Sequence, residues 1–265
     1  MSEAAVQTAT AGGVCTITLN RPAALNALNQ DLAIGLRDAA LAAEQDQSAR
    51  CLVIRGGQNF MAGGDLKWFD DLVRSRRPEQ NRIEFERFAG DVHSVIVSLR
   101  RMPKPVVASV RGAAAGFGMS LMMACDLVIA ADNAYFSLAY SLIGASPDGG
   151  STFALPRIVG AKKAMEIALL SDRFDAATAE RLGLVNRVVP ALALEDETAT
   201  LAARLAAGPM AVYGRTKQLL NASLNSTLES QLQREAEAFA QSASEPAFAE
   251  GVRAFIEKRK PQWPR

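Results

Sequence analysis

The sequence predicts an α/β fold, in which short strands alternate with helices along most of the chain. Five short apolar runs have the β-branched composition of strands, at residues 14–19, 51–55, 105–110, 127–130 and 185–189. Apolar residues at helical spacing fill the stretches between the first three runs. Such alternation is typical of proteins that cover a sheet with helices.

The first two helices have recognisable boundaries. Between the first two strand-like runs, leucines and other apolar residues recur at helical spacing over residues 25–41, after the turn signal Arg21-Pro22. Between the second and third runs, residues 88–99 repeat the pattern, and Pro103 ends that helix. A segment rich in glycine and alanine precedes the fourth strand-like run.

The C-terminal part of the sequence is almost entirely helical in character. Residues 194–207, 210–224 and 228–255 are rich in helix-forming residues, with breaks at Gly208-Pro209 and Pro246. No linker composition separates this part from the rest. We therefore expect a core domain at residues 1–190 and a helical oligomerisation module at residues 191–265 that can serve a neighbouring subunit.

Composition excludes several classes of protein. The 265 residues carry 29 Lys and Arg against 28 Asp and Glu, so the basic surface expected of a nucleic-acid or anionic-membrane binder is missing. Apolar stretches are broken well before the roughly 20 residues that a membrane span needs. Three widely spaced cysteines suit neither a disulfide framework nor a zinc cluster. We expect a cytoplasmic protein.

His93 is the only histidine in the sequence. A histidine-rich metal site is therefore excluded, as is any Ser-His or Cys-His triad in which His93 is not the base. Its helical surroundings favour a surface or packing role over catalysis.

Two glycine-rich passages, at residues 56–66 and 112–121, each follow a strand-like run. Backbone amides exposed at such places can bind an anion, although a tight turn with close backbone packing is the simpler interpretation. Neither passage has the Lys-Ser/Thr of a Walker A loop or the spacing of a dinucleotide-binding fingerprint.

These passages belong to a larger set of motifs, found at residues 19–22, 26–28, 60–66, 112–126, 147–151, 155–157 and 250–259. In order and spacing the set resembles the enoyl-CoA hydratase/isomerase (crotonase) superfamily over essentially the whole chain. The resemblance implies a crotonase-like α/β fold of repeated ββα turns with a C-terminal helical trimerisation module. It also implies a homotrimer or a dimer of trimers that binds acyl-CoA thioesters.

The chemistry shared by this family is the stabilisation of a thioester enolate by two backbone N–H groups. The resemblance places these groups at Gly64 and Phe117, where Phe117 departs from the usual glycine. Fixed amides, one of them at a helix N-terminus, stabilise a negative oxygen without reorganisation. The resemblance implies no metal and no separate cofactor, because coenzyme A is part of the substrate.

The acid and base groups distinguish the possible reactions. Hydration of a 2-enoyl-CoA in this family resembles a task for two glutamates, whose positions align with Ser120 and Tyr140. Neither is a carboxylate, and a tyrosine is a poor base. Asp148 is the remaining candidate, either as a helix N-cap or as the catalytic base. Its Pro-Asp-Gly-Gly context is similar to the isomerase subgroup that includes the ring-1,2-epoxyphenylacetyl-CoA isomerases.

The resemblance also implies a set of contacts to the substrate. Those to coenzyme A and the acyl group fall on Ala23, Met61, Ala62, Asp65, Leu66, Lys67 and Tyr140. Phe239 and Lys258 align with positions that bracket the adenine and 3′-phosphate, from an adjacent subunit. A solvated helix end explains Lys258 equally well.

The sequence therefore favours an acyl-CoA isomerase that shifts a C=C bond or rearranges a ring epoxide. Asp148 is the expected base, and Gly64 and Phe117 are the expected oxyanion hole. An enoyl-CoA hydratase with an atypical active site is a second interpretation. A catalytically inactive paralogue that binds acyl-CoA or associates with RNA is a third, against which the near-zero net charge argues.

Overall fold

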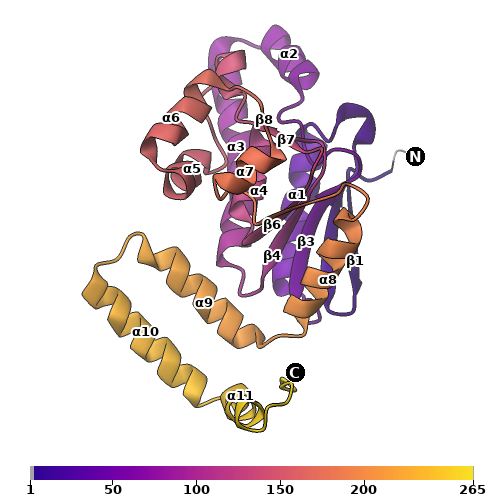
Figure 1. Ribbon diagram of the computed structural model, residues 1–265. Helices are drawn as coiled ribbons and strands as arrows, with labels where there is room; N and C mark the ends of the chain where they lie inside the picture. Colours follow the sequence, from indigo (N-terminus) through magenta and orange to yellow (C-terminus); the bar gives the residue numbers. More distant parts are fainter. Residues whose placement is uncertain (1–2, 265) are drawn as a thin grey trace.

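The computed structural model describes residues 3–264, which form two β-sheets surrounded by helices (Figure 1). The larger sheet has the strand order β1-β2-β3-β4-β6-β9. Its strands are β1 (Val6–Ala11), β2 (Val14–Leu19), β3 (Cys51–Gly56), β4 (Val106–Val110), β6 (Leu127–Ala131) and β9 (Arg187–Val189). All neighbours pair in parallel except β1 and β2, which form an antiparallel hairpin. The α/β expectation and the five expected strands are confirmed.

The sequence patterns missed four strands. Strand β1 is largely exposed and rich in threonine and alanine, so it lacks the apolar alternation that marks a strand. The other three, β5 (Ala113–Ala115), β7 (Tyr135–Ser137) and β8 (Phe174–Asp175), form a second sheet. They have only two or three residues each, which is too short for a periodic pattern.

Both faces of the larger sheet are buried, as β3 shows. Leu52 and Ile54 point into the main core, while Cys51 and Val53 pack against the opposite cluster. Successive side chains of a strand point to opposite faces, so a nearly continuous apolar run indicates a strand covered on both sides. This explains why β3 was recognisable without alternation.

Helices cover the sheet on both faces. They are α1 (Gln30–Gln45), α2 (Leu66–Ser75), α3 (Pro78–Arg101), α4 (Phe117–Ala124), α5 (Ser151–Val159), α6 (Ala161–Leu170), α7 (Ala176–Arg181), α8 (Leu194–Ala206), α9 (Met210–Ser223), α10 (Leu228–Ala243) and α11 (Pro246–Ile256). Two short 3-10 helices, η1 (Pro22–Ala24) and η2 (Tyr140–Ile143), complete the chain. In the part of the chain described, no helix is both long enough and apolar enough to span a membrane.

The first expected helix starts later than its leucine pattern indicates. Helix α1 begins at Gln30, where the Asn29 side chain accepts the N–H of Leu32 as an N-cap. Leu25 and Asn26 instead have left-handed backbone conformations. The Asn26 amide donates to the carbonyl of Asn59 at 2.7 Å, which ties this loop to the first glycine-rich passage. The expectation of a helix from residue 25 was therefore wrong at its start.

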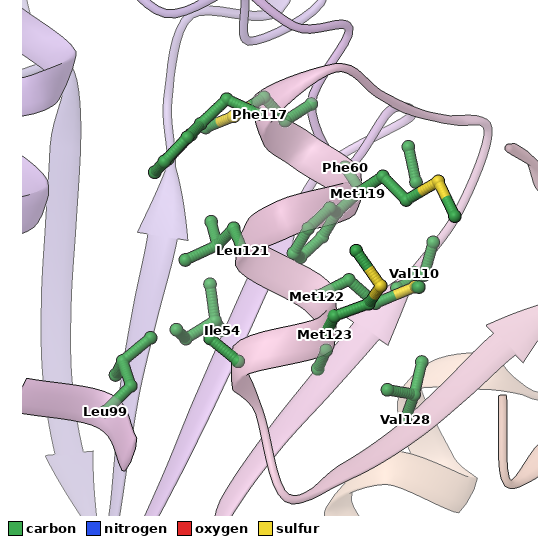
Figure 2. Close-up of a cluster of buried hydrophobic side chains, with 14 of the residues drawn as sticks. Ile54, Phe60, Leu99, Val110, Phe117, Met119, Leu121, Met122, Met123 and Val128 are labelled. Atoms are coloured by element: carbon green, nitrogen blue, oxygen red, sulfur yellow. The ribbon is translucent and has the colours of Figure 1, made fainter. Parts of the chain in front are cut away.

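Helix α4 lies at the centre of the molecule, and all eight of its residues are buried. Figure 2 shows its apolar side chains spread around the helix axis and surrounded by side chains from strands and helices on several sides. Residues labelled there on α4 are Phe117, Met119, Leu121, Met122 and Met123, and those around them are Ile54, Phe60, Leu99, Val110 and Val128. Burial on every side fixes the position of the α4 N-terminus.

The C-terminal helices divide into one that packs on the sheet and three that project away. Ala202 and Ala206 of α8 pack against β3 and β4. Helices α9 to α11 form an arm that extends from the rest of the molecule (Figure 1). The arm is attached through Lys217 of α9, which donates to the Leu99 carbonyl at 2.6 Å and pairs with Asp126 at 2.7 Å.

Candidate active site

The two glycine-rich passages meet and run in parallel. Met61 N–H donates to the Ala113 carbonyl at 2.8 Å, and Ala115 N–H donates to the Met61 carbonyl at 2.9 Å. Three residues further on, a β-carbon on Gly116 would lie 3.2 Å from the α-carbon of Gly63. The two backbones therefore touch just before Gly64 and Phe117.

The N–H groups of Gly64 and Phe117 are free to bind a ligand. Gly64 bridges in parallel to Leu28, whose bonds go to the Gly63 carbonyl and the Asp65 N–H, so the N–H of Gly64 points away from Leu28. Phe117 is the first residue of α4, where an N–H has no acceptor within the helix. Neither N–H donates to an acceptor within residues 3–264.

This pair of amides has the chemistry of an oxyanion hole. The partial positive charge at the α4 N-terminus adds to the two N–H dipoles, so a negative oxygen between them is favoured. Space at Gly64 is limited, because a β-carbon there would lie 2.6 Å from the Phe69 ring. Glycine at position 64 therefore keeps this amide accessible.

Asp148 lies where three elements meet. Its carboxylate Oδ1 accepts the hydroxyl of Tyr140, the first residue of η2. Its main-chain carbonyl accepts the hydroxyl of Ser120 on α4 at 3.0 Å and that of Ser151 on α5 at 2.9 Å. The structure thus gathers around Asp148 the two positions, 120 and 140, at which the resemblance places glutamates.

The carboxylate of Asp148 does not cap a helix. The N-cap of α5 is Gly150, and no side chain caps that helix. Only the main-chain carbonyl of Asp148 bonds to Ser151, whereas the side chain turns to Tyr140. The N-cap interpretation of Asp148 was wrong, which leaves its carboxylate available for chemistry.

Tyr140 acts as a hydrogen-bond donor in this arrangement. Burial raises the pKa of its phenol, and the neighbouring Asp148 carboxylate raises that pKa further. Hydrogen bonding from Ser120 acts in the opposite direction but does not outweigh these two causes. The phenol therefore stays protonated at working pH.

Gly149 connects the carboxylate to the oxyanion hole. A β-carbon at this position would lie 2.8 Å from both the Phe117 ring and the Ser120 β-carbon, and its φ of 61° is left-handed. The N–H of Gly149 donates to His93 Nε2 at 3.3 Å. His93 therefore contacts the site loop, a role that sequence reasoning missed. A contact across 56 positions leaves no signal in local spacing.

The residues expected to contact coenzyme A lie around the first glycine-rich passage. Met61 is fully buried, whereas Ala23 in η1 and Leu66 and Lys67 at the start of α2 are exposed. Ala62 is half-buried between them. The Asp65 carboxylate accepts the Trp68 N–H as the N-cap of α2 and pairs with Arg21 at 2.9 Å, so its own contacts orient this loop.

Phe239 and Lys258 lie far from these residues within the chain. Phe239 is exposed on α10, and Lys258 follows α11. Figure 1 places both helices at the opposite end of the molecule from α2. A role for these two residues at the site therefore requires the neighbouring subunit to which the sequence analysis assigned them.

The fold and site define a protein that presents two backbone amides to a negative oxygen beside a carboxylate. The enoyl-CoA hydratase/isomerase family model matches residues 9–265. The chain belongs to the enoyl-CoA hydratase/isomerase family, and the expected crotonase-like fold is confirmed.

Individual relatives carry both isomerase and hydratase names. The chain is 38% identical over 253 residues to the 1,2-epoxyphenylacetyl-CoA isomerase of Escherichia coli (strain K12), covering 95% of each. It is also 38% identical over 253 residues to a probable enoyl-CoA hydratase of Rhodobacter capsulatus, covering 95% of this chain and 94% of that one. An enoyl-CoA hydratase structure from Polaromonas sp. JS666 matches with a TM-score of 0.91 and 36% identity, covering 98% of this chain and 99% of that one.

Proposed function

We propose that the protein is an acyl-CoA isomerase that moves a C=C bond between the 3,4 and 2,3 positions, or rearranges a related ring epoxide. The observation that carries the proposal is the set of side chains at the base. Asp148 supplies the carboxylate, while Ser120 and Tyr140 occupy the positions of the two hydratase glutamates and bond to Asp148.

One carboxylate is sufficient for this reaction. Asp148 removes a proton from C2 of a 3-enoyl thioester, and the electron pair of the broken C–H bond moves into a dienolate. The negative oxygen of the dienolate lies between the N–H groups of Gly64 and Phe117. Protonated Asp148 then returns the proton to C4, which yields the 2-enoyl thioester. The sequence of steps is a proton transfer and needs no metal or redox group.

Substrate binding follows the same division of the site. We assign the coenzyme A contacts to Ala23, Ala62, Leu66 and Lys67 on the exposed side of the first loop, with Met61 and Asp65 shaping its backbone. Tyr140 borders the reacting end of the acyl group. In a homotrimer or dimer of trimers, Phe239 and Lys258 of a neighbouring subunit complete the nucleotide end.

Hydration by Asp148 alone is the second candidate. The hydratase names of the Rhodobacter capsulatus and Polaromonas relatives favour it. It would require a single carboxylate both to orient a water molecule and to supply the proton, tasks that the resemblance divides between two glutamates.

A coupled spectrophotometric assay with 3-enoyl-CoA and 2-enoyl-CoA separates the two candidates. We expect the wild type to isomerise the 3-enoyl substrate, and Asp148→Asn to lose a hundredfold or more, within the roughly 10²–10⁴-fold typical of general acid–base groups. Hydration of the 2-enoyl substrate as the only activity, or an unimpaired Asp148→Asn variant, would contradict the isomerase proposal.

A further inference from the structure

We propose that Tyr140 is a positioning residue that immobilises the Asp148 carboxylate, so that one oxygen, Oδ2, both removes and returns the proton. This inference rests on the proposed isomerase function and assigns Tyr140 a part in it. The observation behind it is the hydrogen bond from the Tyr140 hydroxyl to Asp148 Oδ1.

The main chain of Asp148 is already fixed before Tyr140 is considered. Its carbonyl accepts the Ser120 hydroxyl at 3.0 Å, the Ser151 hydroxyl at 2.9 Å and the Ser151 N–H at 3.2 Å. The remaining freedom of the residue is rotation of its side chain. A donor held on one carboxylate oxygen removes that rotation.

Tyr140 is itself well anchored. Its N–H donates to the Leu138 carbonyl at 2.8 Å, and its carbonyl accepts the Ala145 N–H at 3.1 Å. Because both ends of the loop between Tyr140 and Asp148 are tied, the phenol meets the carboxylate without a large ordering cost. Its raised pKa keeps the phenol in the donor form.

The groups around Asp148 leave this role to Tyr140. Helix α4 contributes the uncharged Ser120, whose hydroxyl bonds to the main chain of Asp148. Helix α3 contributes His93, which bonds to the N–H of Gly149. Of these side chains, Tyr140 is the one with a hydrogen bond to the carboxylate itself.

The consequence for the reaction is a proton that stays on one oxygen. The C2–H bond breaks as the Oδ2–H bond forms, and the Oδ2–H bond breaks as the C4–H bond forms. Oδ1 remains an acceptor of the phenol throughout, so the carboxyl group does not rotate and expose its proton to water. We therefore expect a large share of the substrate proton to reach the product.

The first test measures the pair without any substrate. Tyrosine is labelled with ¹³C at Cζ, and the three tyrosine signals are followed against pH in the wild type and in Asp148→Asn. We expect the Tyr140 phenol to remain protonated through pH 10, its ordinary midpoint, and Asp148→Asn to lower its pKa by about one pH unit or more, because the carboxylate charge is lost. An unchanged Tyr140 signal in Asp148→Asn would overturn the proposal.

The second test measures proton transfer. A 3-enoyl-CoA with deuterium at C2 is isomerised by the wild type, by Tyr140→Phe and by the control Tyr135→Phe. Tyr135 lies on β7, where Arg173 stacks on its ring at 4.8 Å. For Tyr140→Phe we expect kcat to fall about tenfold with KM little changed, since misplacement of a base by 1 Å can cost up to about 10²-fold. We also expect less deuterium at C4 of the product, whereas Tyr135→Phe matches the wild type.

The two tests fail in different ways. A wild type that does not isomerise contradicts the proposed function, while the tyrosine titration still reports on the pair. An active wild type whose Tyr140→Phe variant retains kcat and deuterium overturns the positioning role and leaves the isomerase function standing. Because the titration uses Asp148→Asn, poor folding of Tyr140→Phe does not prevent a decision.

Discussion

The two halves of the site are built from different parts of the chain. The oxyanion half consists of backbone N–H groups at Gly64 and Phe117, held by ladder bonds between two adjacent loops. The acid–base half consists of side chains from α4, η2 and the start of α5, held by hydrogen bonds around Asp148. The first half suits any thioester enolate, whereas the second determines where protons move.

The two halves also tolerate different changes. In the oxyanion half a phenylalanine replaces the family glycine at position 117, because only its N–H is needed. In the acid–base half, replacement of two glutamates by Ser120 and Tyr140 changes the reaction that we propose. Backbone catalysis is therefore robust to side-chain identity, and side-chain catalysis is not.

Removing one backbone donor should break the oxyanion half with the largest effect. Phe117→Pro lacks the N–H, and proline is compatible with the first residue of a helix such as α4. We expect kcat to fall about 10²–10³-fold, as for loss of one oxyanion-hole donor. Steady-state kinetics with the isomerisation substrate measures this loss.

Phe117→Leu is the matched control, because it removes the ring but keeps the N–H. We expect its kcat to stay within about tenfold of the wild type, together with some loss of stability from the smaller buried side chain. Equal losses in both variants would show that the ring, rather than the amide, carries the function of this position.

The oxyanion half was largely predictable from the sequence. Glycine-rich passages that follow strands are local patterns, and the parallel strands β3 and β4 bring the two loops together in register. Gly64 and Phe117 could therefore be proposed before their geometry was known. The start of α1 was not predictable in the same way, because Asn26 is held by a contact with Asn59 rather than by local propensity.

The acid–base half was only partly predictable. Asp148 and Tyr140 could each be named from the motif, but their hydrogen bond depends on how η2 folds back on the start of α5. The choice between N-cap and base for Asp148 depended on the direction of its side chain, which spacing does not encode. Tertiary contacts of this kind become visible only in the structure.

A β-carbon at Gly149 should disturb both halves at once. In Gly149→Ala it would lie 2.8 Å from the Phe117 ring and from Ser120, and φ is left-handed. We expect the loop to shift and kcat to fall up to about a hundredfold, since small displacements of catalytic groups cost this much. Kinetics and thermal unfolding are measured together.

Gly144→Ala separates strain from collision. Gly144 has a similar φ of 69°, but a β-carbon there meets nothing within 4 Å. We expect Gly144→Ala to lower stability slightly and to leave kcat near the wild-type value. A similar fall in kcat for both variants would attribute the effect to backbone strain in the loop, not to displacement of Phe117 and Asp148.

Loss of the His93 contact should have the smallest effect, and it tests whether the acid–base half needs support from α3. Its Nε2 accepts the Gly149 N–H at 3.3 Å, at an exposed position. A hydrogen bond of this kind contributes about 0.5–1.5 kcal/mol, so His93→Leu should lower kcat by a factor of roughly 2–10. His93→Gln retains an acceptor oxygen and should restore most of that loss. If both variants equal the wild type, the bonds from Ser120 and Ser151 hold the loop without α3, and the acid–base half then depends on its own three elements, just as the oxyanion half depends on its own two loops.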